Sequence, residues 1–120
     1  MTSILTVAVT VTGVSVASAH TVLIASNPAK GSTIKILPAK ITLKFADPLL
    51  TLGKRAINRV VVTDPKSRIV TTGKDIVKGA VLTDSMTTIT PIAGLYNVNY
   101  RVSAQDGHIV TGSFTFKLQS

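Results

Sequence analysis

The 120-residue sequence contains no cysteine, and this absence excludes several classes of protein. Without cysteine there is no disulfide framework, no zinc site built from thiolates and no blue-copper centre with its cysteine ligand. Export remains compatible with this composition, because a domain of this length buries enough apolar surface to fold without disulfides. The chain is therefore expected to form one self-supporting domain, and a metal site in it would use nitrogen and oxygen donors.

Tryptophan and glutamate are also absent, and only 4% of the residues are aromatic. The 13 lysines and arginines face 5 aspartates, which gives a formal net charge of +8. The basic residues are scattered along the chain, with Lys54 and Arg55 as the only adjacent pair. A surface that binds nucleic acid would interleave them with aromatic residues on which bases can stack. The composition therefore predicts a solvated basic surface, at most weakly attracted to anionic lipid or polymer, and no nucleic-acid partner.

Short segments rich in valine, isoleucine and threonine follow one another along the chain, separated by turn residues. Such β-branched residues favour strands, and Asn-Pro, Asp-Pro and Gly-containing dipeptides favour turns. Strands are predicted at residues 21–26, 41–45, 59–63, 69–72, 80–83, 87–90, 95–102 and 109–118, with the first one buried and a turn at Asp84-Ser85. Residues 69–72 are expected to pair with 59–63 as a hairpin, and residues 74–78 carry the weakest signal. Seven or eight short strands without a helix predict an all-β fold, either a β-sandwich or a Greek-key β-barrel.

The first 19 residues carry no charged side chain and end in Ala17-Ser18-Ala19, the small-x-small pattern that signal peptidase cleaves after. We therefore expect residues 1–19 to be a signal peptide and residues 20–120 to be the mature domain. One feature is atypical, because Met1-Thr2-Ser3 lacks the usual lysine or arginine. An uncleaved anchor and a buried N-terminal strand are the alternatives. The first fits poorly, because the segment is short, contains Gly13 and is rich in threonine and serine.

Cleavage after Ala19 would place His20 at the N-terminus. The α-amine and the imidazole of one residue would then offer two nitrogen ligands, and the modest pKa of the amine lets it lose its proton when a metal competes for it. A second candidate lies in the loop Ser103–His108 between the last two predicted strands, where Asp106 and His108 are separated by one glycine. These side chains can converge on one hard or borderline cation. The alternative is an ordinary hairpin loop, because Asp-Gly is itself a strong turn signal.

Several stretches of the sequence resemble the copper-resistance CopC family, which includes the PcoC and YobA proteins. The most specific is the Ser-Ala-x-Asp-Gly-His loop, which stands between a strand and a Gly-Ser-Phe-x-Phe strand. The resemblance runs from His20 to the end of the chain and is carried by His20, Ser26–Gly31, Ile41–Pro48, Gly94–Val102, Ser103–His108 and Gly112–Phe116. It implies a small exported domain of cupredoxin-like Greek-key topology that binds Cu(II) as a chaperone or buffer.

The resemblance also implies a set of ligands for one Cu(II) ion per chain: the amine and imidazole of His20, with Asp106 and His108. Nitrogen-rich tetragonal coordination completed by oxygen suits Cu(II). Asp47 stands where the family has glutamate in its Phe-x-Glu-Pro motif, and being one methylene shorter it is the weaker candidate, expected to orient a ligand or simply to form a turn. Met86 is the single methionine after residue 19, so the methionine-rich Cu(I) site of some members is not expected, and it should be a packing or surface residue. Tyr100 replaces the family's usual tryptophan and is expected to be a substitution in the core.

The sequence thus predicts a non-catalytic Cu(II) protein of the bacterial periplasm, or of the cell exterior. It is expected to be a monomer that stores copper or passes it to an inner-membrane transporter of the CopD type. Two other functions remain open. One is a metal-free immunoglobulin-like interaction domain. The other is an oxidative enzyme with a copper brace, which would require a flat aromatic face and an open metal position.

Overall fold

The computed structural model describes residues 21–87 and 90–120, and within these ranges the regular secondary structure consists of β-strands without a helix. The chain forms two four-stranded sheets, with the orders β1-β3-β6-β5 and β2-β8-β7-β4. The eight strands are β1 (Leu23–Asn27), β2 (Thr33–Ile34), β3 (Lys40–Phe45), β4 (Arg59–Thr63), β5 (Ile76–Lys78), β6 (Val81–Ser85), β7 (Gly94–Ser103) and β8 (Ile109–Leu118). All pairings between strands are antiparallel except that of β2 with β8.

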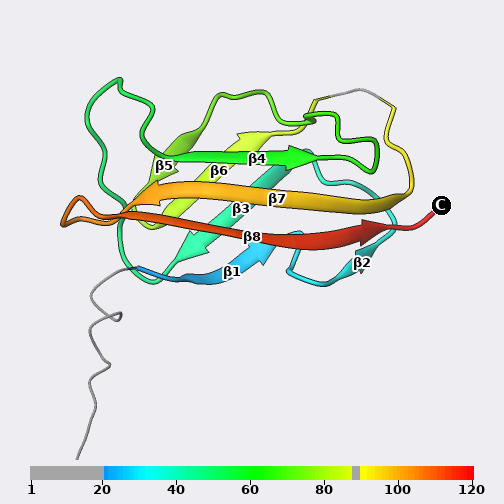
Figure 1. The fold of residues 1–120 in the computed structure, drawn as a ribbon, viewed down its shortest axis with the longest axis horizontal. Helices are drawn as coiled ribbons and strands as arrows, with labels where there is room; N and C mark the ends of the chain where they lie inside the picture. The colour runs from blue at the N-terminus through cyan, green and yellow to red at the C-terminus, as the bar shows by residue number, and fades with distance from the viewer. Residues whose placement is uncertain (1–20, 88–89) are drawn as a thin grey trace, which may run out of the picture.

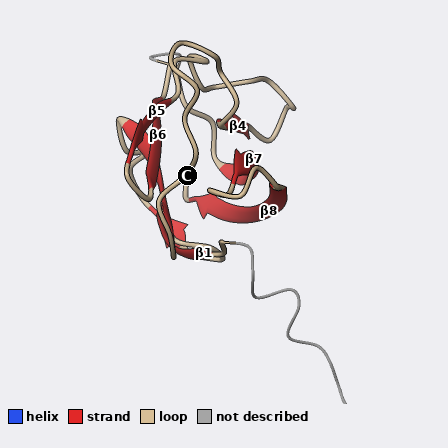
Figure 2. Cartoon of the chain, turned by 90° about the vertical axis from the view of Figure 1, so that its left-hand side faces the viewer, coloured by secondary structure: helices blue, strands red, loops and turns tan. Residues whose placement is uncertain are grey.

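The two sheets pack face to face, so the fold is a β-sandwich (Figure 1; Figure 2). The all-β prediction is confirmed. Of the two architectures that the strand pattern allowed, the closed barrel is wrong, because β1, β5, β2 and β4 end their sheets as edge strands. None of the described residues forms a helix of the length and apolar character needed to cross a membrane.

Alternation of apolar and polar residues decides which face of each strand is buried. Along β3, Ile41, Leu43 and Phe45 point between the sheets and are at most 1% exposed, while Lys40 and Lys44 point outward. The long hairpin of β7 and β8 follows the same rule, and its register places Tyr96 opposite Phe116. Their rings stack with centroids 5.1 Å apart. Full burial of a large apolar side chain contributes about 1.5–3 kcal/mol, so this core accounts for much of the stability of the sandwich.

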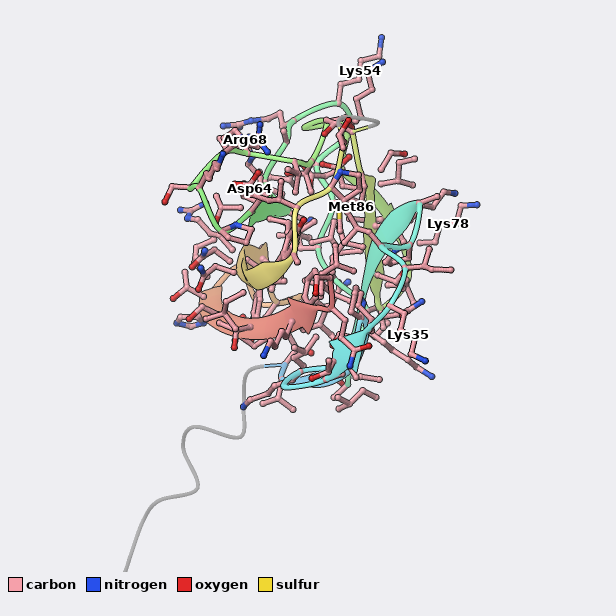
Figure 3. All side chains as sticks on the ribbon, turned by 90° about the vertical axis from the view of Figure 1, so that its right-hand side faces the viewer. Lys35, Lys54, Asp64, Arg68, Lys78 and Met86 are labelled. Carbon is pink, nitrogen blue, oxygen red and sulfur yellow. The ribbon has the colours of Figure 1, made fainter. Side chains whose placement is uncertain are left out.

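Tyr100 lies at the margin of that core, as expected for a substitution at a packed position. It is half-buried and meets Phe45 edge to face, with ring centroids 5.4 Å apart and an interplanar angle of 72°. Its ring also lies over the backbone of Gly112, its register partner on β8, where a larger residue would collide with it. Met86, predicted to be a packing or a surface residue, is 7% exposed and packs in the core (Figure 3).

The structure corrects several local predictions. The first strand is an edge strand and not a buried one, because Val22 and Ile24 are 55% and 56% exposed. Asp84 does not form a turn but lies inside β6, where its carboxylate accepts hydrogen bonds from Thr72 Oγ1 and from the amides of Gly73 and Ser85. Residues 69–72 are not a strand, but their predicted antiparallel pairing with 59–63 is present in part, as the bridge between Thr63 and Ile69 and the 2.9 Å hydrogen bond from the Val70 amide to the Val62 carbonyl. Thr87 lies outside any strand, and residues 88–89 fall outside the described ranges. The two-residue strand β2 was too short to show a periodic pattern.

A buried carboxylate in the turn after β4 leads to a prediction about acid stability. Asp64 accepts hydrogen bonds from the amides of Lys66 and Arg68 and from Arg68 Nε, the last at 2.7 Å (Figure 3). Burial alone would raise the pKa of Asp64, but the bonds from the Arg68 amide, its side chain and the Lys66 amide outweigh it and hold the pKa below the ordinary value of 3.8. A lowered pKa stabilises the fold above the unfolded-state value, and this stabilisation disappears as the pH falls through the folded-state value.

We therefore expect Asp64→Asn to lower the urea midpoint at pH 7, and the deficit relative to the unmodified protein to shrink between about pH 4 and pH 2. Equilibrium urea unfolding of both proteins at several pH values in this range measures the difference in midpoint. A deficit that stays constant down to the lowest pH would show that the charge of Asp64 does not contribute.

Candidate metal site

The loop that joins β7 to β8 is a tight turn at one end of the sandwich, at the left in Figure 1. The amide of Ala104 donates to the carbonyl of His108 at 2.9 Å, and the amide of Gly107 donates to the carbonyl of Ala104 at 2.9 Å. Gly107 has a φ of +89°, a conformation that favours glycine over residues with a side chain. The turn predicted from Asp-Gly is therefore present, and its hydrogen bonds define the positions of the two residues that flank the glycine.

The structure brings Asp106 and His108 into direct contact. One carboxylate oxygen, Oδ2, lies 2.9 Å from Nδ1 of His108, and the other, Oδ1, accepts the backbone amide of His108 at 2.9 Å. Because a carboxylate only accepts, Nδ1 must carry the hydrogen, and in the neutral imidazole the lone pair is then on Nε2. A carboxylate that fixes the tautomer and the ring orientation in this way is typical of metal-binding histidines.

Asp106 can combine this orienting role with binding, because each carboxylate oxygen has two lone pairs. The two side chains are 43% and 66% exposed, so an ion from solvent can reach them without rearrangement of the core. Together they offer one oxygen and one nitrogen donor, which fits a borderline divalent cation. Within residues 21–87 and 90–120, no group of three or more histidine, cysteine or acidic side chains lies close enough together to hold a metal ion.

The third predicted ligand, His20, lies outside the described residues, but its neighbour Thr21 does not. Thr21 is 3% exposed, and its hydroxyl oxygen accepts the backbone amide of Asp47 at 3.1 Å. This bond attaches the chain directly after His20 to the segment that follows β3. In Figure 1 the start of the described chain, the end of β3 and the β7–β8 loop all lie at the same end of the sandwich.

Asp47 itself is exposed, and its carboxylate has no hydrogen bond or ion pair to another described residue. The structure therefore places Asp47 at the same end as the Asp106–His108 pair without joining their side chains. The segment that follows it is held directly against the loop. Gln105 Nε2 donates to the carbonyls of Pro48 and Leu49 at 3.4 and 3.1 Å, and the amide of Leu50 donates to the carbonyl of Ser103 at 3.0 Å.

Asn58 is a second link, which the sequence reasoning missed. Its side chain is 4% exposed and bridges the same two segments, donating from Nδ2 to the carbonyl of Leu50 at 2.7 Å and accepting the amide of Ser103 at 2.8 Å. Thr21 was missed as well. Both are polar residues beside apolar strands, so the sequence gives no signal that separates them from ordinary turn residues.

Comparison with known proteins identifies relatives of the whole domain. The family model described as the CopC domain matches residues 23–119. "Copper resistance protein C" of Pseudomonas syringae pv. tomato is 34% identical over 106 residues, which cover 86% of this chain and 83% of the relative.

Two crystal structures share the fold. The CopC structure from Methylosinus trichosporium OB3b has a TM-score of 0.70 and 23% identity, covering 83% of this chain and 94% of the other. PcoC from Escherichia coli, described as a methionine-rich copper resistance protein, has a TM-score of 0.66 and 26% identity, covering 83% of this chain and 99% of the other.

Proposed function

Because the chain belongs to the CopC family of copper-resistance proteins, we propose that it binds one Cu(II) ion through His20, Asp106 and His108. The observation that carries this proposal is the contact between Asp106 and His108, which orients a histidine at the end of the sandwich where the described chain begins. The amine and imidazole of His20 would complete a donor set rich in nitrogen, and such a set suits the tetragonal preference of Cu(II).

The anchored position of Thr21 supports the participation of His20. The hydrogen bond between Thr21 and Asp47 holds the residue next to His20 in the sequence, and consecutive Cα atoms are only about 3.8 Å apart. The same bond brings the start of the described chain to Asp47, and Gln105 and Asn58 join the segment after Asp47 to the loop at residues 103–108. In this proposal Asp47 does not bind copper but accepts a hydrogen bond from a ligand such as the amine of His20.

The proposal requires that residues 1–19 act as a signal peptide, so that cleavage releases the amine of His20. The protein would then act in the periplasm or at the cell exterior. There it would buffer copper as a monomer or pass it to an inner-membrane transporter of the CopD type. Side chains as exposed as those of Asp106 and His108 on a hydrogen-bonded turn are consistent with transfer, because a partner can approach the ion without unfolding the donor.

Binding without catalysis is supported by the positions of the aromatic side chains. The chain has two tyrosines and three phenylalanines and no tryptophan, and all five aromatic residues are buried or half-buried. Enzymes that cleave polysaccharides with a copper brace need an exposed aromatic face to bind the polymer, and these five side chains do not form one.

Isothermal titration of the chain that begins at His20 tests the proposal. We expect uptake of one Cu(II) per chain and an affinity that rises with pH, because the amine and the imidazoles must lose their protons to bind. Electron paramagnetic resonance should report nitrogen donors. Absence of tight one-to-one uptake would overturn the proposed function.

A second prediction concerns the hydroxyl of Thr21, which accepts the Asp47 amide. Thr21→Val keeps the shape of the side chain but removes the acceptor for the Asp47 amide, so we expect a loss of about 1–2 kcal/mol in the free energy of unfolding. We also expect Cu(II) affinity to fall by roughly tenfold, as for other groups that position a ligand without binding the metal. Urea unfolding and copper titration measure the two effects. Thr83→Val, on the outer face of β6, is the matched control and should leave copper affinity unchanged.

A further inference from the structure

The outer face of the β1-β3-β6-β5 sheet presents lysines in register. Lys44 on β3 and Lys78 on β5 both pair with Val81 of the intervening strand β6. All three residues are on the outward side of their strands, since their neighbours Leu43, Val77 and Leu82 pack in the core. The two lysines are therefore separated by two strand spacings, about 10 Å. Lys40, four residues before Lys44 on β3, extends the row along the strand.

No side-chain carboxylate shares this face. The chain has only five acidic side chains, all of them aspartates and all within the described residues. Asp64 and Asp84 are 3% and 2% exposed, and the side chain of Asp75 is 5% exposed, where it accepts the amide of Val60 at 2.9 Å from the opposite sheet. Asp47 follows the end of β3, and Asp106 lies in the loop between β7 and β8, both at the end of the sandwich that carries the candidate metal site (Figure 1). Three of the five negative charges are thus enclosed, and the outer surface of the sheet has lysines without counter-charges.

Exposed aliphatic side chains accompany the lysines. Ile76 pairs with Thr83 on the same outward side and is 52% exposed, and Ile24 at the bulge of the edge strand β1 is 56% exposed. Figure 3 shows that Lys78 and Lys35 extend from the side of the molecule on which this sheet lies. The outer face of this sheet therefore combines spread positive charge with exposed apolar side chains.

We propose that this lysine face is a docking surface for a membrane of anionic phospholipid. Headgroups form a plane of negative charge, and each lysine near such a plane strengthens binding by roughly fivefold. Lysines have a long flexible stem and a point charge, which suits a mobile layer of headgroups, while arginine forks and aromatic platforms, the usual devices for nucleic acid, are absent from the face. The exposed isoleucines would enter the boundary between headgroups and acyl chains.

Docking through this sheet would leave the loop with Asp106 and His108 accessible. With the sheet lying on the bilayer, the strands run along its surface, and the loop with Asp106 and His108 projects sideways from the end of the sandwich. That loop stays accessible to a partner embedded in the same membrane. Because membrane docking does not require copper, the vesicle experiment tests it independently of the proposed metal site.

Vesicle co-sedimentation tests the inference. Both sheets lie within the described residues, so the chain beginning at His20 is used, which removes any contribution of the apolar residues 1–19 to lipid binding. We expect binding to phosphatidylcholine vesicles that contain about 30% phosphatidylglycerol, no binding to pure phosphatidylcholine, and release as salt rises from about 0.1 M to about 1 M, because the Debye length falls from about 10 Å to about 3 Å.

Two triple variants with the same change in net charge separate a specific face from general attraction. K40Q/K44Q/K78Q should weaken vesicle binding about a hundredfold, by roughly fivefold per lysine. K54Q/K66Q/K117Q removes three exposed lysines that lie elsewhere and should stay within about threefold of the unmodified protein. Circular dichroism and thermal unfolding check the fold of both, and K44Q alone serves if the first triple variant is unstable.

Equal losses in the two triple variants, or failure of the unmodified protein to bind anionic vesicles, would overturn the inference. Binding to soluble polyglutamate without binding to vesicles would also overturn it and would assign the face to an acidic polypeptide.

Discussion

An extra alanine placed before His20 is expected to weaken Cu(II) binding by at least about a hundredfold. Loss of a residue that only orients a metal ligand costs 10–100-fold in affinity, so displacement of a ligand should reach at least the upper end of this range. The extension moves the α-amine one residue away from its place next to the imidazole. Because Thr21 is held by the Asp47 amide, the rest of the chain cannot shift by one residue to restore the chelate. Copper titration of the two chains, analysed at one pH, measures the change.

Three further forms identify which donor is lost. A chain with the extra alanine at its C-terminus is the control and should bind like the unmodified protein. N-acetylation of His20 removes the amine but leaves the imidazole in place, whereas a chain that begins with alanine in place of His20 keeps an amine and removes the imidazole. Both should lose affinity, and the paramagnetic spectra should show fewer nitrogen donors. Unchanged affinity and spectra in the extended chain would show that the amine is not a ligand.

His108→Ala is expected to produce a loss of the same order, about a hundredfold or more. The imidazole that Asp106 holds through Nδ1 supplies the nitrogen donor of the loop, and no other histidine lies in the described residues. The turn should survive the substitution. Its backbone bonds between Ala104, Gly107 and His108 do not involve the side chain, and the Asp106 carboxylate still accepts the amide of residue 108. Copper titration and circular dichroism together separate lost binding from lost structure.

Asp106→Asn tests the second ligand of the loop, and Lys66→Ala serves as the control for both substitutions. Asparagine keeps an oxygen that can accept the backbone amide of His108, but it removes the charge that favours both the Nδ1 hydrogen bond and a bound cation. We therefore expect at least a tenfold loss of affinity. Lys66 lies in another exposed turn, and its substitution should leave affinity within about twofold. If His108→Ala bound copper as tightly as Lys66→Ala, the loop would be an ordinary hairpin and the metal-free interaction domain would become the better description.

Local sequence was sufficient for most of the strands, because a half-buried strand shows its alternation in its own residues. Residues 41–45 and the hairpin of 95–102 with 109–118 alternate cleanly, and the structure has β3, β7 and β8 there. The wrong strand and turn predictions concern positions whose burial depends on other segments of the chain, which local sequence does not identify. Asp84-Ser85 is a pair of residues typical of turns. Asp84 nevertheless lies inside β6, because Thr72, Gly73 and Ser85 donate hydrogen bonds to its buried carboxylate. The apolar run at residues 22–25 predicted a buried strand, yet β1 is an edge strand because only β3 pairs with it.

For the candidate metal site too, one part follows from local sequence and another part depends on the tertiary structure. The Asp-Gly-His turn is encoded within three residues, since glycine at positive φ and an aspartate two positions before the histidine suffice to bring carboxylate and imidazole together. The sequence also predicts the donors of a metal site, because a chain without cysteine and with one methionine after residue 19 offers mainly nitrogen and oxygen ligands.

Tertiary structure alone decided that Thr21, Asp47 and the loop at residues 103–108 meet at one end of the sandwich. Such a meeting depends on which strands pair and in which order. That order is set by the summed packing of two sheets, and no short stretch of residues contains it.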